Sequence, residues 1–205
     1  MMEPEQFLKI ILIFFYAVIL HECAHGWVAY QLGDSTAKVA GRLTLNPLKH
    51  VDPIGTLVLP TLLFLLPSPV IFGWAKPVPV NFSALRHPKR DMMLVAMAGP
   101  LVNIALAVVF SLLLKGRFSH SDSQVLQMAV EINLVLALFN MIPIPPLDGS
   151  RVVMGLLPNE LARPYMKLER YGMVIVFALL YFGLLKTIVL PLVFLLGRLL
   201  GVALS

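Results

Sequence analysis

Four long apolar stretches, separated by short polar segments, dominate the chain. Three of them, residues 7–30, 92–114 and 125–142, are apolar along most of their length, and each is long enough as a helix to cross a hydrocarbon core of about 30 Å. The fourth, residues 171–196, contains a lysine and a proline, so we expect one long or broken span there. The pattern predicts an all-α polytopic membrane protein with about four full transmembrane helices.

Other segments depart from this simple pattern. Residues 54–74 are apolar but contain three prolines, which disfavours a straight helix and predicts a re-entrant or broken segment packed within protein. Residues 38–47, KVAGRLTLNP, alternate well enough to predict a short β-hairpin or strand at the membrane surface. Residues 149–157 predict a short helix, and residues 158–170 a polar loop.

Composition and charge agree with a membrane environment. Of the 205 residues, 59% are hydrophobic and only 13% are charged, far from the mix of a soluble domain. The net charge of +5 is normally carried by the cytoplasmic loops of such a protein and gives no indication of nucleic-acid binding. We expect one membrane-embedded domain over residues 1–205, including the first span, because the start MMEPEQ lacks the basic character of a secretory signal.

The first span carries His21, Glu22 and His25 in the sequence HECAH. Residues i and i+4 share one helical face, so both imidazoles can bind one metal while Glu22 stands beside its open position. Zinc is the expected metal, because a catalytic zinc takes three protein ligands and leaves its fourth position to water, with the Glu as general base. The pattern arises by chance in roughly one chain in a few hundred of this size, but ionisable groups within a span cost free energy and mark function.

A second motif, NMIPIPPLDG at residues 140–149, follows a later span and offers Asp148 as the third ligand. Pro143, Pro145 and Pro146 remove helix donors, so the backbone there cannot be helical and must line protein or water at membrane depth. An unwound strand near a metal can pair with an extended substrate, which peptide hydrolysis requires. An ordinary helix end at the membrane surface is the alternative for this segment taken alone.

The two motifs together resemble the site-2 protease family of intramembrane metalloproteases, in a minimal form without a PDZ domain. In that family, HExxH on one transmembrane helix is completed by the Asp of an NxxPxPxLDG motif on another. The resemblance implies one Zn²⁺ per chain held by His21, His25 and Asp148. It also implies that Glu22 activates water and that Asn140 holds the substrate backbone or the oxyanion.

The sequence AGPLVN at residues 98–103 is similar to the central helix of the same family. There Gly99 would allow close helix packing. Asn103 would either support a metal ligand or serve the structure alone.

The remaining ionisable candidates are weaker. We expect the three loop histidines to be solvated, and none is assigned as a ligand: His50, His87 and His120. Cys23, the one cysteine, lies on a different helical face from the two motif histidines and forms no internal disulfide. Glu131 either lines the substrate path or pairs with a neighbouring polar group.

Depth and charge predict a topology. His21 lies roughly 21 Å along the first span and Asn140 about 22 Å along the third, so the two motifs meet only if these helices run in the same direction. Residues 54–74 must then return to the side that they left. Running the first helix from outside to inside places most loop cations in the cytoplasm and leaves only Lys115 and Arg117 outside.

These observations predict an intramembrane zinc metalloprotease that hydrolyses membrane proteins, single-span ones above all, within or near the bilayer. We expect a multi-pass protein of a prokaryotic cell membrane, with the active site toward the cytoplasm. The alternatives are a metal-binding membrane protein without hydrolytic activity, such as a transporter or an inactive relative, and a membrane HExxH protease whose third ligand is a Glu. A transport site would need ligands but no general base, so Glu22 discriminates between the first two possibilities.

Overall fold

Three long helices form the body of the molecule: α1 (Pro4–Gln31), α4 (Pro88–Leu113) and α5 (His120–Asn140). The computed structural model describes residues 4–58, 62, 65 and 75–204. The first half also contains α2 (Thr36–Val39), η1 (Pro47–Lys49), η2 (Pro53–Val58) and η3 (Phe82–Ala84). The second half continues with α6 (Asp148–Leu156), α7 (Asn159–Met166), η4 (Lys167–Tyr171), α8 (Gly172–Tyr181), η5 (Leu185–Val189) and α9 (Leu190–Leu199).

The long helices begin and end where the sequence gives local signals. Pro88 occupies the first turn of α4, where the missing N–H costs nothing. The Ser119 side chain caps α5 by accepting a hydrogen bond from the Asp122 amide. α5 ends at Asn140, shortly before the prolines that cannot continue it. Each of these three helices is long and apolar enough to cross a membrane.

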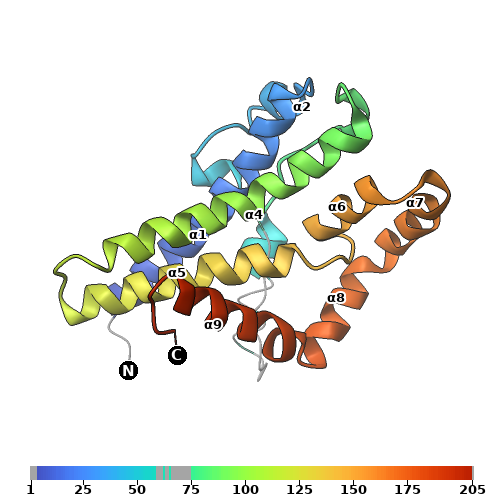
Figure 1. Ribbon diagram of the computed structural model, residues 1–205. Coiled ribbons are helices and arrows are strands. Elements are labelled where there is room, and N and C mark those ends of the chain that lie inside the picture. The colour runs from blue at the N-terminus through green and yellow to red at the C-terminus, as the bar shows by residue number, and fades with distance from the viewer. Residues whose placement is uncertain (1–3, 59–61, 63–64, 66–74, 205) are drawn as a thin grey trace.

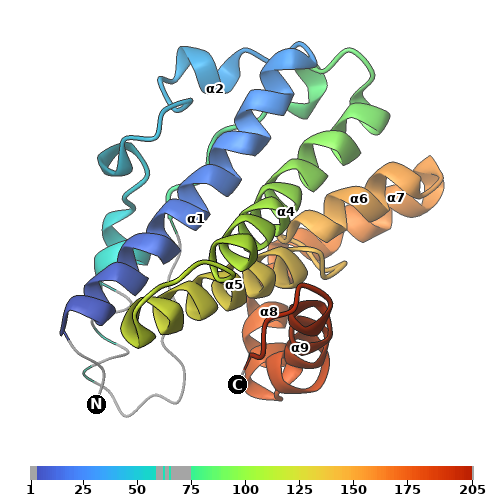
Figure 2. The ribbon, with the colours of Figure 1, turned by 60° about the vertical axis from the view of Figure 1, so that its left-hand side comes forward.

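Helix α4 packs against both α1 and α5, as Figures 1 and 2 show. The starts of α1 and α5 lie together, because Gln6 donates to Ser121 Oγ at 2.9 Å and Lys9 donates to Asp122 Oδ1 at 3.0 Å. α1 and α5 therefore run in the same direction, with α4 antiparallel to both. This arrangement confirms the direction that the two motifs require.

The chain between α1 and α4 leaves and returns at one end of the bundle. The Arg86 amide donates to Leu32 O at 3.0 Å, and the Lys76 amide donates to His50 O at 2.9 Å. The chain before residue 51 is thus hydrogen-bonded to the chain after residue 75. This is required if the segment between them returns to the side of the membrane from which it started. The re-entrant conformation itself was expected over 54–74, most of which lies outside the described residues, so it stays a prediction.

The β-hairpin expected over residues 38–47 is wrong, because the described chain there forms α2 followed by turns and coil. Buried Asp34 accepts hydrogen bonds from the Thr36 amide and hydroxyl and so turns the chain into a helix at once. The Arg42 side chain is also buried instead of following an in–out alternation. These side-chain contacts override the weak alternation of the sequence.

The polar loop expected over residues 158–170 is also wrong, because α7 and η4 occupy most of it. Glu160 lies in the first turn of α7 and Arg163 in its last, the arrangement that the helix dipole favours. The short helix expected over residues 149–157 is confirmed by α6.

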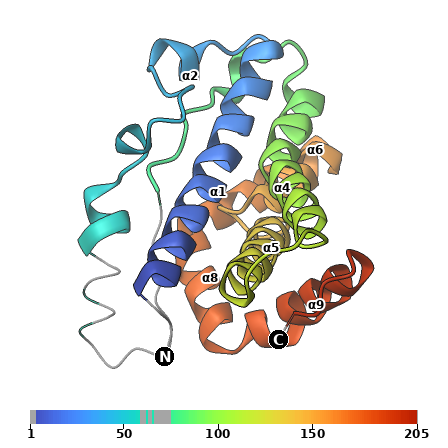
Figure 3. The same ribbon diagram turned by 90° about the vertical axis from the view of Figure 1, so that its left-hand side faces the viewer.

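The last apolar stretch is broken. The helical segments Asn159–Tyr181 and Leu185–Leu199 meet at an angle of 69° and count as a fourth span only if taken together. α9 packs against α5 around Val130, Leu134 and Val193, and Figure 3 shows α9 on one side of α5 and α2 beyond α1. The described residues form an all-helical, multi-pass integral membrane protein with three to four candidate spans.

Candidate metal centre

Three side chains from two distant parts of the chain meet inside the bundle. His21 and His25 lie on α1, and Asp148 is the first residue of α6. Asp148 Oδ2 lies 3.0 Å from His21 Nε2 and 3.2 Å from His25 Nε2. The side chains are well shielded, since His21 is 6% and His25 8% exposed. This cluster has the ligand types and closeness of a zinc site, with all three ligand atoms within 4.8 Å of one another.

The other nitrogen of each imidazole is already engaged. His25 Nδ1 lies 2.7 Å from Val95 O, a backbone carbonyl that can only accept, so this nitrogen donates. His21 Nδ1 lies 2.6 Å from Asn103 Oδ1. The Asn103 amide nitrogen in turn donates to Ala17 O and to Asn133 Oδ1, which assigns Oδ1 as the acceptor toward His21. In neutral rings with both Nδ1 atoms protonated, both Nε2 atoms present lone pairs to Asp148.

Two imidazole lone pairs and a carboxylate oxygen that face one another repel unless a cation lies between them. A divalent metal satisfies all three acceptors at once. Gly99 keeps the room for it, because a Cβ built there would lie 2.4 Å from His25 Nε2 and 2.5 Å from His21 Nε2. The residues present therefore fit a zinc ion, and Gly99 is a requirement of the site as well as of helix packing.

Asp148 reaches the histidines because the chain breaks between α5 and α6. Residues 141–147 run without a regular helix, as the prolines predicted, and the Tyr165 hydroxyl donates to Pro143 O at 2.8 Å. Gly149 lets α6 begin directly beside this segment, since a Cβ there would lie 2.2 Å from Met141 O. The break thus delivers a carboxylate to α1 from a helix that is too short to span the membrane.

Two residues expected at the site have other contacts. Glu22 Oε2 accepts a hydrogen bond from the Val78 amide at 2.8 Å. The Asn140 amide nitrogen donates to Leu136 O at 2.9 Å within α5, and among the described residues it forms no hydrogen bond with the three ligand candidates. Its substrate-binding role stays a prediction.

Asn133 and the Val95 carbonyl were missed by sequence reasoning. Asn133 is fully buried on α5, accepts from Asn103 and donates to Ala129 O at 2.8 Å, so it completes a polar chain that ends at His21. An asparagine within an apolar span was the available signal, because a buried amide needs partners there. The Val95 carbonyl carried no signal, since every residue has one.

The loop histidines divide into two kinds. His87 and His120 are exposed, as expected. His50 is fully buried, so the expectation that it is solvated is wrong: its Nε2 donates to Thr44 O at 2.8 Å and fixes the loop around it. Cys23 does point away from the motif histidines, toward Thr44 O at 3.2 Å.

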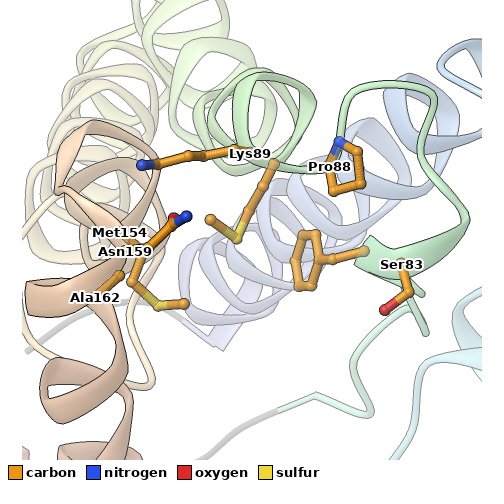
Figure 4. A pocket seen from close by; sticks show the side chains of 8 residues that line it. Ser83, Pro88, Lys89, Met154, Asn159 and Ala162 are labelled. Atoms are coloured by element: carbon orange, nitrogen blue, oxygen red, sulfur yellow. The ribbon is translucent and has the colours of Figure 1, made fainter.

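A hollow of about 360 Å³ lies elsewhere, between η3, the start of α4, α6 and α7 (Figure 4). Its wall is mostly apolar, with Ser83, Lys89 and Asn159 as the polar members. It contains no imidazole and no carboxylate, so it lacks the groups for the chemistry of the His–His–Asp cluster.

The sequence of the chain matches known proteins in both of its halves. The model of Peptidase family M50 matches residues 117–183, which include Asn140 and Asp148. A Bacillus subtilis protein named "Putative zinc metalloprotease YwhC" is 40% identical over 166 residues, 76% of this chain and 72% of that protein. The chain belongs to Peptidase family M50. The M50 relative named "Putative zinc metalloprotease Rip2" from Mycolicibacterium smegmatis is 30% identical over 178 residues, 85% of this chain and 67% of that protein.

More distant relatives extend to archaea. The protein named "Zinc metalloprotease MJ0392" from Methanocaldococcus jannaschii is 27% identical over 182 residues, 85% of this chain but 42% of that protein. A comparison with solved structures found no match. The names of these relatives agree with the donor set found here.

The support of His21 by Asn103 gives a first prediction. Asn103→Ala removes the acceptor for Nδ1–H, so the ring can rotate or change tautomer, and we expect zinc affinity to fall about 10- to 100-fold. Competition with a chromogenic chelator measures it. Ser111→Ala, a change of another buried polar residue on α4, should leave the affinity unchanged. Equal zinc affinity in Asn103→Ala and wild type would mean that Asn103 serves only the packing of α4.

Proposed function

We propose that this M50 protein is an intramembrane zinc metalloprotease of the site-2 type, with one zinc per chain held by His21, His25 and Asp148. The observation that carries the proposal is the meeting of three acceptor atoms, within 4.8 Å of one another, beside a glutamate that follows the first ligand in the chain. Structural packing alone gives no reason to gather three acceptors in an apolar bundle, since each costs free energy to bury.

The residues around the ligands supply the remaining chemistry. When bound, zinc acts as a Lewis acid that polarises the scissile carbonyl and makes water a stronger acid. Glu22 takes a proton from the attacking water and passes it to the leaving amine. Val95 O and Asn103 hold the imidazole rings in the orientation seen here. Asn140 donates to the substrate carbonyl, in exchange for its bond to Leu136 O within the same helix.

The substrates proposed are membrane proteins, single-span ones above all. The ligand candidates lie among helices apolar enough to cross a membrane, so a peptide bond reaches them most directly from a neighbouring span. A substrate helix must unwind first, because its amides are shielded. The irregular backbone of residues 141–147 beside Asp148 offers polar groups to such an unwound segment.

A metal transporter or an inactive relative is less consistent with the site. Transport needs ligands that release their ion toward either side, whereas His21 and His25 are fixed by bonds to α4. Transport also needs no general base. Glu22, however, supplies a carboxylate next to His21 that is not one of the three clustered ligands.

We also propose that the protein lies in a prokaryotic cell membrane with the metal site toward the cytoplasm. The end of the bundle where α1 ends and α4 begins carries Lys38, Lys49, Arg86 and Lys89, whereas the turn between α4 and α5 carries only Lys115 and Arg117. Such a bias orients the first loop toward the cytoplasm.

Zinc content tests the proposed ligand set. Purified wild type should hold about one zinc per chain, and His21→Ala, His25→Ala and Asp148→Ala should each hold far less, because a two-ligand site leaves the coordination open. Elemental analysis of the detergent-solubilised protein measures this. His120→Ala, a change of an exposed histidine, is the control and should keep its zinc. Full zinc in Asp148→Ala would remove that residue from the ligand set.

The role of Glu22 is tested by Glu22→Gln, which keeps the size of the side chain but cannot accept the proton of water. We expect zinc to stay and cleavage to fall about 10²- to 10⁴-fold. Comparing membrane proteomes of cells with wild type or variant would reveal the uncut substrates. Glu160→Gln, on exposed α7, makes the same chemical change away from the site and should cleave normally. Undiminished cleavage by zinc-loaded Glu22→Gln would exclude the proposed mechanism.

Cysteine labelling tests the orientation on a Cys23→Ser background. His87→Cys, just before α4, should react only after the membrane is made permeable, whereas Arg117→Cys, between α4 and α5, should react with an impermeant reagent in intact cells. Both positions are exposed, so access depends on the side of the membrane. The reverse pattern would put the metal site toward the outside.

A further inference from the structure

The Val78 amide is the group that contacts Glu22. It donates to Glu22 Oε2 at 2.8 Å. Val78 lies between Pro77 and Pro79 in residues 75–81, a stretch without regular secondary structure. Because prolines have no amide hydrogen, the Val78 N–H is the only backbone donor among residues 77–79, and it goes to the carboxylate proposed as general base.

The stretch is anchored on both sides of Val78. The Arg42 guanidinium donates to Lys76 O at 2.6 Å and to Pro77 O at 3.3 Å. The Lys76 amide donates to His50 O at 2.9 Å, and beyond Val78 the Asn81 amide donates to Asp34 Oδ2 at 2.7 Å. The position of the Val78 amide is therefore set by side chains from the α1–α2 loop and from the chain after α2.

The cation that holds this stretch is unusually buried. Arg42 is 8% exposed, and its Nε finds no hydrogen-bond partner among the described residues. No carboxylate among the described residues forms an ion pair with Arg42, so its bonds to the two carbonyls offset the free-energy cost of burying the guanidinium. Val78 also packs closely on α1, since a Cβ on Gly26 would lie 2.6 Å from its Cγ1.

We propose that Arg42 is a positioning residue of the general base. By clamping the carbonyls of Lys76 and Pro77, it holds the Val78 N–H on one oxygen of Glu22, which leaves Oε1 to face the reacting water. The inference rests on the proposed role of Glu22 and adds what fixes that side chain. A glutamate has three side-chain torsions, so without an external donor its carboxylate would sample many directions.

A latch that blocks Glu22 until it is released is the competing interpretation. The contact uses Oε2 alone, and the second carboxylate oxygen forms no hydrogen bond with the described residues. The anchors on both sides of Val78 also resist the displacement that a latch needs. A fixed support for catalysis explains both features.

Steady-state kinetics test the proposal, with fluorescein-labelled β-casein as the substrate because an unfolded chain needs no unwinding. Arg42→Ala and Val78→Pro, which removes the amide hydrogen, should each lower kcat about 10- to 100-fold with little change in KM, as expected when a reacting group is misplaced by about 1 Å. Arg42→Lys, whose ammonium can still donate to a carbonyl, should restore part of kcat. Zinc content should stay at the wild-type level in all three.

A control separates the loss of the Arg42 contacts from the loss of a positive charge. Lys38→Ala removes an exposed cation close to Arg42 in the chain, so it should keep wild-type kcat. A raised kcat in Val78→Pro would overturn the proposal in favour of a latch. Unchanged kcat in Arg42→Ala and Val78→Pro, with Glu22→Gln inactive, would overturn the proposal and leave the protease function standing. Cleavage by Glu22→Gln would instead overturn the function itself.

Amide exchange gives a readout that needs no activity. A peptide covering residues 76–80 has two backbone amide hydrogens, those of Val78 and Val80, because Lys76 becomes its amino terminus and prolines have no N–H, so the exchange of Val78 can be followed by mass spectrometry. We expect Glu22→Ala and Arg42→Ala each to speed it at least about 10-fold, because each removes a bond that holds this amide. Exchange as slow in Arg42→Ala as in wild type would mean that Arg42 does not hold Val78 on Glu22.

Discussion

Two imidazole nitrogens and a carboxylate oxygen face one another at a depth where little water can separate them, and this unfavourable contact constrains the surrounding structure. It is tolerable only around a cation, and the other polar groups nearby ensure that the three atoms stay in place. Val95 O and Asn103 fix the two rings. Asn133 fixes Asn103 in turn. Gly99 keeps the space open. Each of these contacts lies on a different turn of α4 or α5, so the packing of the long helices and the chemistry of the site cannot be separated.

The break between α5 and α6 brings the Asp148 carboxylate to the middle of the helix bundle. A spanning helix satisfies its own backbone, whereas a break exposes polar groups that only protein or water can satisfy at that depth. Here the chain turns at the prolines, the Tyr165 hydroxyl donates to Pro143 O, and α6 begins with Asp148. The same irregular backbone that supplies the ligand is the part of the site best suited to contact an unwound substrate. The position of Asp148 and the proposed contact with the substrate would thus both depend on the break between α5 and α6.

The features that could be predicted from the sequence are those set by local pattern. The spacing of His21 and His25, the three long spans and the prolines before Asp148 each depend on residues close together in the chain. Two of the misses involve contacts between residues far apart in the chain. Arg42 was expected in a hairpin but is buried, and its partner Lys76 O is 34 residues away. His50 was expected in water but supports that same stretch through its carbonyl. No local periodicity encodes a side chain that bonds to a backbone carbonyl elsewhere, so such contacts appear only in three dimensions.

The geometry of a helix explains why Glu22 needs support from outside α1. His21 and His25 point the same way because four residues make about one turn, but a residue one step from His21 points about 100° away. Its side chain must bend back toward the metal position, and α1 itself offers no free donor to hold it there, since the helix bonds its own amides. The donor has to come from another segment, and a stretch with a single amide between two prolines can offer it to only one acceptor. A donor from a segment outside α1 can orient such a base, and here the Val78 amide reaches Glu22 Oε2.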